Sequence, residues 1–138
     1  MIEKIYNYIL VDEYIATAGQ PQEHEFEYIA NCGYEIVINL TASDKTLHSE
    51  DIIVSKYNMT YLHIPVEWEN PTIESMNLFM TMLENLNRQK KRIFIHCVKN
   101  YRVSMFIYKY KKDILNQKDV VLIIPDNHIP SQAWDNIL

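Results

Sequence analysis

The segment "IFIHCVKNYRVS", residues 93–104, carries the strongest indication of the fold. Residues 91–97 contain the apolar run of residues 93–95 and predict a buried strand, and apolar residues recur at helical spacing from Val103 onward. The order strand, short loop, helix places Cys97 at the carboxyl end of a strand and the loop at the amino end of a helix. In parallel α/β proteins ligands bind at that end of the sheet, where free N–H groups favour an anion.

The rest of the chain repeats this strand–helix order on both sides of the segment. The predicted strands are 14–18, 35–40 and 60–66, and the predicted helices after them are 21–32, 49–57 with Ser49 as N-cap, and 72–89 headed by Thr72. The pattern of residues 119–124 fits a strand or a helix, and residues 131–138 suggest a short terminal helix. We therefore predict a single α/β domain over residues 1–138, with a mainly parallel central sheet flanked by helices.

Composition excludes several classes of protein. The net charge is −5 and the 13 Lys and Arg residues are scattered, which predicts no nucleic-acid partner. No segment predicts a membrane span or a cleaved leader, and no membrane partner is expected. Two cysteines are too few for a disulfide framework, and no Cys/His spacing suggests a metal. We expect a cytoplasmic protein without metal or cofactor, in which Cys32 is an inert core residue.

The residues of the segment suggest nucleophilic chemistry on an oxyanion. A helix amino end stabilises the thiolate form of Cys97, which would then act as a nucleophile. Arg102 offers a planar fork of donors that matches phosphate or sulfate oxygens. His96 would point away from the pocket and tune Cys97 through hydrogen bonds.

At these residues the chain resembles the cysteine-dependent protein tyrosine and dual-specificity phosphatases. Their signature is His-Cys, five residues, Arg, then Ser or Thr. The stretches "IATAGQPQEHEFEYIANCGYEIVINL", "YLHIPVEWENPT" and "HCVKNYRVSMFIY" resemble a bacterial phosphatase-like family, related to the phosphatase-like domain of beta-lactamase-hydrolase-like proteins. The resemblance implies hydrolysis of phosphomonoesters, with phosphotyrosine as one candidate. It also implies Cys97 as the nucleophile of a cysteinyl-phosphate intermediate, Arg102 as the ligand of the phosphoryl oxygens, and Ser104 as an aid to the departing thiolate.

The loop departs from that signature by one residue. The residues expected to bind the substrate with Arg102 are Val98, Lys99, Asn100 and Tyr101, four between Cys97 and Arg102 where the signature has five. Val103 stands where the arginine is expected, and Ser104 keeps its usual spacing. Asn100 stands where the signature often has glycine, and asparagine enters left-handed conformations more easily than most residues.

Two alternatives remain open at this stage. A four-residue spacing is also typical of rhodanese-type sulfurtransferases, in which a shorter loop holds a persulfide. A catalytically inactive protein could instead use the loop to bind an anion or a phosphoprotein without turnover. The partners expected are accordingly a phosphorylated small molecule, a phosphoprotein or another oxyanion.

A phosphatase also needs an acid to protonate the leaving oxygen. The stretch "PVEWENPT", residues 65–72, holds Glu67 four positions before Pro71, the spacing of the phosphatase acid loop. Glu67 is our candidate, with Glu69 behind it. Trp68 between them would cap the pocket or pack against the edge of the sheet.

Overall fold

The central element of the fold is a five-stranded sheet with strand order β1-β2-β5-β3-β4. The structure is a computed structural model and describes residues 1–138. The strands are β1 (Ile9–Leu10), β2 (Ile15–Ala18), β3 (Ile36–Asn39), β4 (Thr60–His63) and β5 (Ile93–His96). All neighbours pair in parallel except β1, which runs antiparallel to β2. The prediction of a mainly parallel α/β sheet is confirmed, and the short edge strand β1 is an addition to it.

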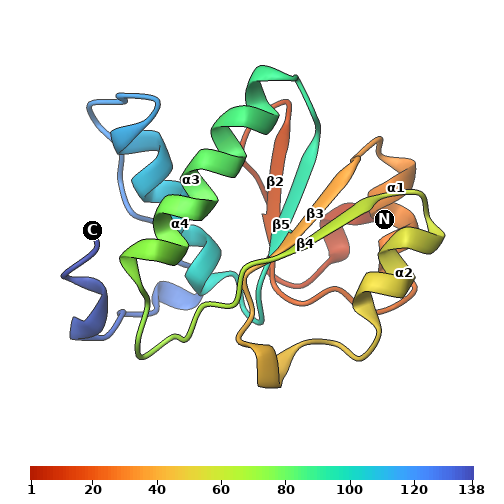
Figure 1. Cartoon of the computed structure of the whole chain (residues 1–138), viewed down its shortest axis with the longest axis horizontal. Helices are drawn as coiled ribbons and strands as arrows, with labels where there is room; N and C mark the ends of the chain where they lie inside the picture. Colours follow the sequence, from red (N-terminus) through yellow and green to blue (C-terminus); the bar gives the residue numbers. More distant parts are fainter.

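Helices cover both faces of the sheet (Figure 1). The short helices α1 (Glu25–Asn31) and α2 (Glu50–Lys56) lie on one face, and the longer α3 (Ile73–Arg88) and α4 (Tyr101–Asp113) lie on the other. Successive strand residues point to opposite faces, so each strand supplies two cores. In β5, Ile93 and Ile95 join the core under α3 and α4, whereas Phe94 joins the core under α1 and α2.

The central position of β5 explains its sequence. It pairs with β2 on one side and β3 on the other, and all four of its residues are buried. A parallel strand buried on both faces reads as a continuous apolar run. Helix α3 begins directly after Thr72. The Thr72 hydroxyl accepts a hydrogen bond from the Ser75 N–H at 3.1 Å, so Thr72 caps the helix that it was predicted to head.

Several predicted boundaries differ from the structure. The first helix starts at Glu25 rather than residue 21, because the Glu25 carboxylate turns back to accept the Gln22 N–H. The strand from Thr60 ends at His63 rather than residue 66. Ser49 precedes α2 as predicted, but its left-handed backbone (φ 60°) leaves no side-chain cap.

Both ends of the chain form short 3-10 turns, namely η1 (Ile2–Lys4) at the start and η3 (Pro125–Asn127) and η4 (Gln132–Trp134) at the end. A further 3-10 turn, η2 (Ser43–Lys45), lies between β3 and α2. Residues 119–124 are neither helix nor strand and make no backbone hydrogen bonds. The predicted terminal helix is reduced to η4, from which Trp134 is buried in the core beside α4.

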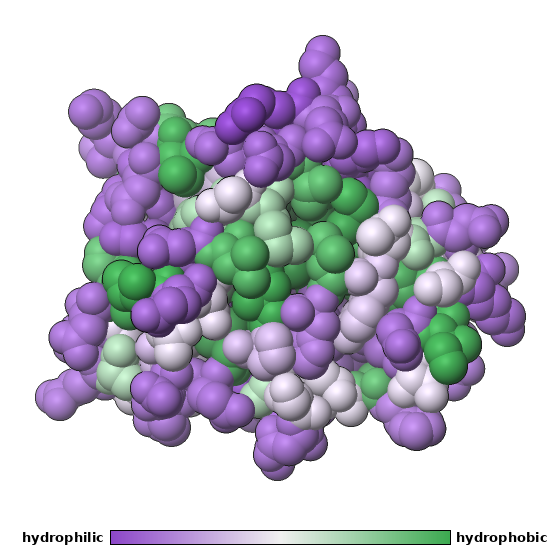
Figure 2. Space-filling view, in the orientation of Figure 1, coloured by the Kyte–Doolittle hydropathy of each residue, from purple (hydrophilic) through white to green (hydrophobic).

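The surface shows two further features. Figure 2 shows apolar side chains gathered between α3 and the sheet. Leu62, Met82 and Leu86 are partly buried and pack against the larger core. Cys32 is exposed at the end of α1, so the prediction of a core cysteine there is wrong. No helix is both long and apolar enough to cross a membrane.

Candidate active site

The loop between β5 and α4 presents a row of free backbone donors. None of the N–H groups of residues 98–103 donates to another backbone group. Asn100 is the N-cap of α4 and has the left-handed backbone (φ 68°) predicted for it. Unpaired N–H groups at the start of a helix of this length favour an anion, since the helix dipole adds to the donors.

The carbonyl groups of the same loop are held by other segments. The Gln20 N–H donates to Val98 O at 2.9 Å, and Asn7 Nδ2 donates to Lys99 O at 3.0 Å. In a trans peptide the C=O and N–H groups point in opposite directions. Because these two carbonyl groups are held by other segments, the N–H groups that follow them point in the opposite direction. They are therefore oriented before any ligand is bound.

Asn100 ties the loop to the N-terminal segment through its buried side chain. Its Nδ2 donates to Asn7 O at 2.9 Å and to Thr17 Oγ1 at 3.1 Å. Its Oδ1 accepts from Ser104 Oγ at 3.4 Å. The side chain is fully buried, so these bonds replace water that it cannot reach.

A cavity of about 310 Å³ lies beside the loop and is strongly cationic. It is lined by Lys45, Trp68, Val98, Lys99, Tyr101, Arg102 and His128, and no carboxylate is among them. The Arg102 Nε is buried without a hydrogen-bond partner, and no salt bridge engages its guanidinium. A partly buried arginine with an unpaired guanidinium in a cationic cavity is suited to bind an oxyanion.

The other wall of the cavity is aromatic. The Tyr101 ring stacks on His128 at 4.3 Å between centroids, and Trp68 contacts Tyr101, His128 and Trp134. A hydrogen bond to Asp126 Oδ2 at 2.8 Å raises the Tyr101 pKa to about 12. Trp68 thus both lines the cavity and packs against the terminal turns. The contribution of His128 was not predicted, because nothing in the local pattern around it indicates contact with a loop so far along the chain.

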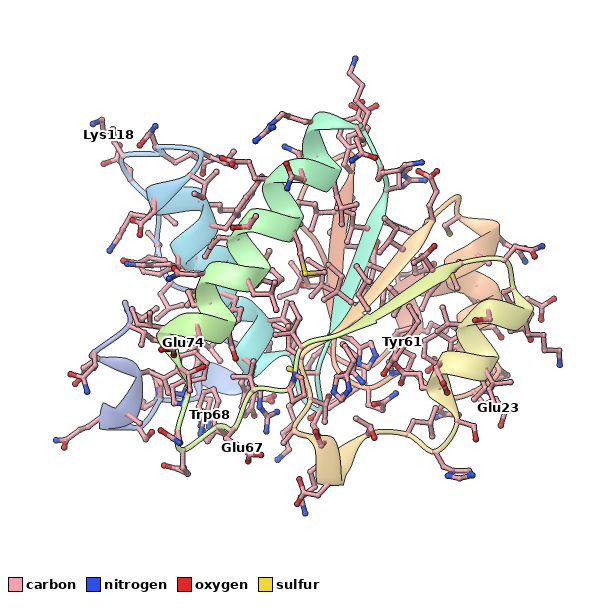
Figure 3. The ribbon with its side chains drawn as sticks, in the orientation of Figure 1. Glu23, Tyr61, Glu67, Trp68, Glu74 and Lys118 are labelled. Atoms are coloured by element: carbon pink, nitrogen blue, oxygen red, sulfur yellow. The ribbon has the colours of Figure 1, made fainter.

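The predicted site residues are only partly brought together. Cys97 is fully buried within the core under α3 and α4 and does not line the cavity. The Ser104 hydroxyl is bonded to Asn100, and no hydrogen bond joins it to the thiol. Glu67 and Glu69 are exposed outside the lining, although Figure 3 shows Glu67 next to Trp68 in the loop between β4 and α3.

His96 lies behind the loop, as its predicted role requires. It is fully buried, with Nδ1 3.2 Å from Cys97 O and Nε2 2.7 Å from Glu50 Oε2. Glu50 was not predicted as part of the site. Its position as the first residue of a short amphipathic helix reads as a solvent-exposed charge, and only the packing of α2 buries it.

A parallel sheet between two helical layers, with an anion loop after its central strand, is the arrangement of the protein tyrosine and dual-specificity phosphatases. Residues 11–131 match the family described as DSP-PTPase phosphatase fused to NAD+ kinase, and the chain belongs to that family. No curated protein sequence matches the chain significantly.

Solved structures agree with this assignment. A DUF442 protein of Shewanella putrefaciens, described as a candidate phosphatase, is 26% identical with a TM-score of 0.88, covering 99% of this chain and 91% of that one. Tk-PTP in its active form is 18% identical with a TM-score of 0.81, covering 95% and 92%. TpbA of P. aeruginosa, solved with pTyr, is 11% identical with a TM-score of 0.68, covering 81% and 66%. The last two show the shared fold alone.

Proposed function

We propose that this protein hydrolyses phosphomonoesters through a cysteinyl-phosphate intermediate. The observation that carries the proposal is the loop of residues 98–103, whose free N–H groups adjoin the unpaired Arg102 guanidinium in a cationic cavity. Donors already oriented toward developing charge stabilise a transition state without reorganising. The match to a phosphatase family supports phosphate chemistry over the sulfur chemistry that the four-residue spacing also allows.

The proposed reaction has two steps. The Cys97 thiolate attacks phosphorus, the ester P–O bond breaks, and the leaving oxygen takes a proton. Water then cleaves the S–P bond, which releases phosphate and restores the thiol. Arg102 and the loop N–H groups bind the phosphoryl oxygens in both steps. Glu67 is the proposed acid, and its exposed side chain must turn toward the cavity beside Trp68 to act.

The cavity favours a small substrate. Its volume lies at the lower end of the usual range for ligand sites, roughly 300–1,000 Å³. The aromatic wall of Trp68, Tyr101 and His128 suits an aryl or other flat leaving group, as in phosphotyrosine. We place the protein in the cytoplasm as part of this proposal, because two free thiols suit a reducing compartment.

A second function is binding of an anion or phosphoprotein without turnover. The observation that favours it is the position of Cys97, which is fully buried and does not line the cavity. A loop with oriented donors and a free arginine would bind a phosphoryl group even if the thiol never reached phosphorus.

One assay separates the two functions. Aryl phosphate hydrolysis is measured with the wild-type protein, Cys97→Ser, and the matched control Cys32→Ser, which removes the exposed thiol instead. Hydrolysis that is lost in Cys97→Ser and kept in Cys32→Ser supports the phosphatase. Anion binding by the wild type without any hydrolysis supports the second function, and thiocyanate formation from thiosulfate and cyanide would support sulfur transfer.

A further inference from the structure

A buried carboxylate adjoins the loop from outside the cavity. Glu50 is the first residue of α2 and is only 2% exposed. No Lys or Arg pairs with it, and the ionisable side chain that faces it is His96. Burying a carboxylate is costly unless its partners compensate for the lost water, so Glu50 needs an explanation.

Both oxygens of Glu50 engage residues that hold the loop. Oε2 lies 2.7 Å from His96 Nε2, and Oε1 accepts from Gln20 Nε2 at 2.8 Å. His96 Nδ1 in turn faces Cys97 O, and the Gln20 backbone N–H donates to Val98 O. One carboxylate is therefore joined, through His96 and Gln20, to the carbonyl groups of Cys97 and Val98.

The same contacts fix the orientation of the His96 ring. Its Nδ1 faces Cys97 O on one side and its Nε2 faces the Glu50 carboxylate on the other, so the two contacts together hold the rotation of the imidazole. Glu50 thereby holds the ring behind Cys97, on the residue that precedes it.

We infer that Glu50 is a positioning residue of the anion site, which holds His96 and Gln20 in place and, through them, keeps the carbonyl groups of Cys97 and Val98 turned away from the ligand. This role rests on the proposed function. Through Glu50, helix α2 takes part in binding the oxyanion although it does not line the cavity. Glu50 itself touches neither the ligand nor the reacting atoms.

Other ionisable groups around the pair do not replace it. Tyr61, which Figure 3 shows on β4 beside α2, hydrogen-bonds Asn39 at 3.0 Å, and burial first of all raises its pKa to about 12, so it stays neutral near pH 7. The remaining groups near Glu50 are His48, Asp51 and His63, which line an open hollow with it. The ring of Phe26, from α1, packs edge-on against His96 and carries no charge. Glu50 is the one carboxylate that pairs with the imidazole.

The test measures sulfate binding by calorimetry in the full chain at neutral pH. Sulfate is the probe because it is a stable dianion that resembles a phosphoryl group. We expect Glu50→Gln, which keeps the shape of the side chain, to weaken binding about tenfold. Urea unfolding of the same variant shows whether the fold is kept while binding is lost. The matched control Asp51→Asn removes an equal but exposed charge one residue along and should leave binding unchanged.

A double-mutant cycle with His96→Asn separates this role from simple support of the fold. If Glu50 acts through His96, Glu50→Gln should have little further effect once His96 is replaced. A loss in Glu50→Gln that is equally large in the His96→Asn background would overturn the inference, as would unchanged binding. A wild type that binds no sulfate would also overturn the inference. The phosphatase proposal is judged separately, because it stands or falls with aryl phosphate hydrolysis by the wild type.

Discussion

Asn100 combines a left-handed backbone with a fully buried side chain, so replacing it separates two contributions to stability. Asn100→Gly keeps the backbone conformation and removes the two short bonds to Asn7 and Thr17. At about 1 kcal/mol for each net hydrogen bond, the free energy of unfolding should fall by about 2 kcal/mol. Asn100→Ala loses the same bonds, and alanine tolerates the left-handed region less well than asparagine or glycine does. The alanine variant should therefore be about 1 kcal/mol less stable than the glycine variant.

The assay is urea unfolding followed by circular dichroism, with Asn58 as the matched control. Asn58 has a similar backbone (φ 61°) but is exposed and makes no side-chain hydrogen bond. Asn58→Gly should change stability by less than about 0.5 kcal/mol, and Asn58→Ala should cost about 1 kcal/mol. An Asn100→Gly variant as stable as the wild type would refute the reasoning, because it would mean that the buried amide bonds contribute nothing.

Three further changes test the loop and the core. Arg102→Lys replaces the planar fork by a point charge, so sulfate affinity should fall about tenfold in calorimetric titration, and an unchanged affinity would remove the arginine from the site. Gly19→Ala places a Cβ 2.7 Å from Val98 O. The free energy of unfolding should fall by about 1–3 kcal/mol, and sulfate binding should weaken. Wild-type values for both would show that the loop can move aside without cost. Burial first of all raises the pKa of Tyr8 and Tyr61 from 10.0 to about 12. Their protonated forms favour the folded state, so this stabilisation is complete below pH 10 and is lost as pH rises through 12, which unfolding at fixed alkaline pH values measures.

The architecture could be predicted because its signals are local. Continuous apolar runs mark strands buried on both faces, and apolar residues at helical spacing mark the long helices. The same local logic predicted the left-handed Asn100 and the burial of Val103, which frees Arg102 to face the loop. The ends of elements were less predictable, because contacts such as the Glu25 turn decide them.

The sequence by itself determined that a cysteine and an arginine flank a short loop between a central strand and a helix. Only the tertiary structure decided which distant groups serve that loop. Asn7 and Gln20 reach it from the N-terminal segment, Glu50 reaches His96 across 46 positions, and His128 stacks on Tyr101. The reason is physical. Many side chains can donate or accept a hydrogen bond, so the sequence does not show which of them pair, and only the packing of the fold brings particular donors and acceptors together. The same packing buries Cys97 in the core, a property that no spacing of residues could reveal.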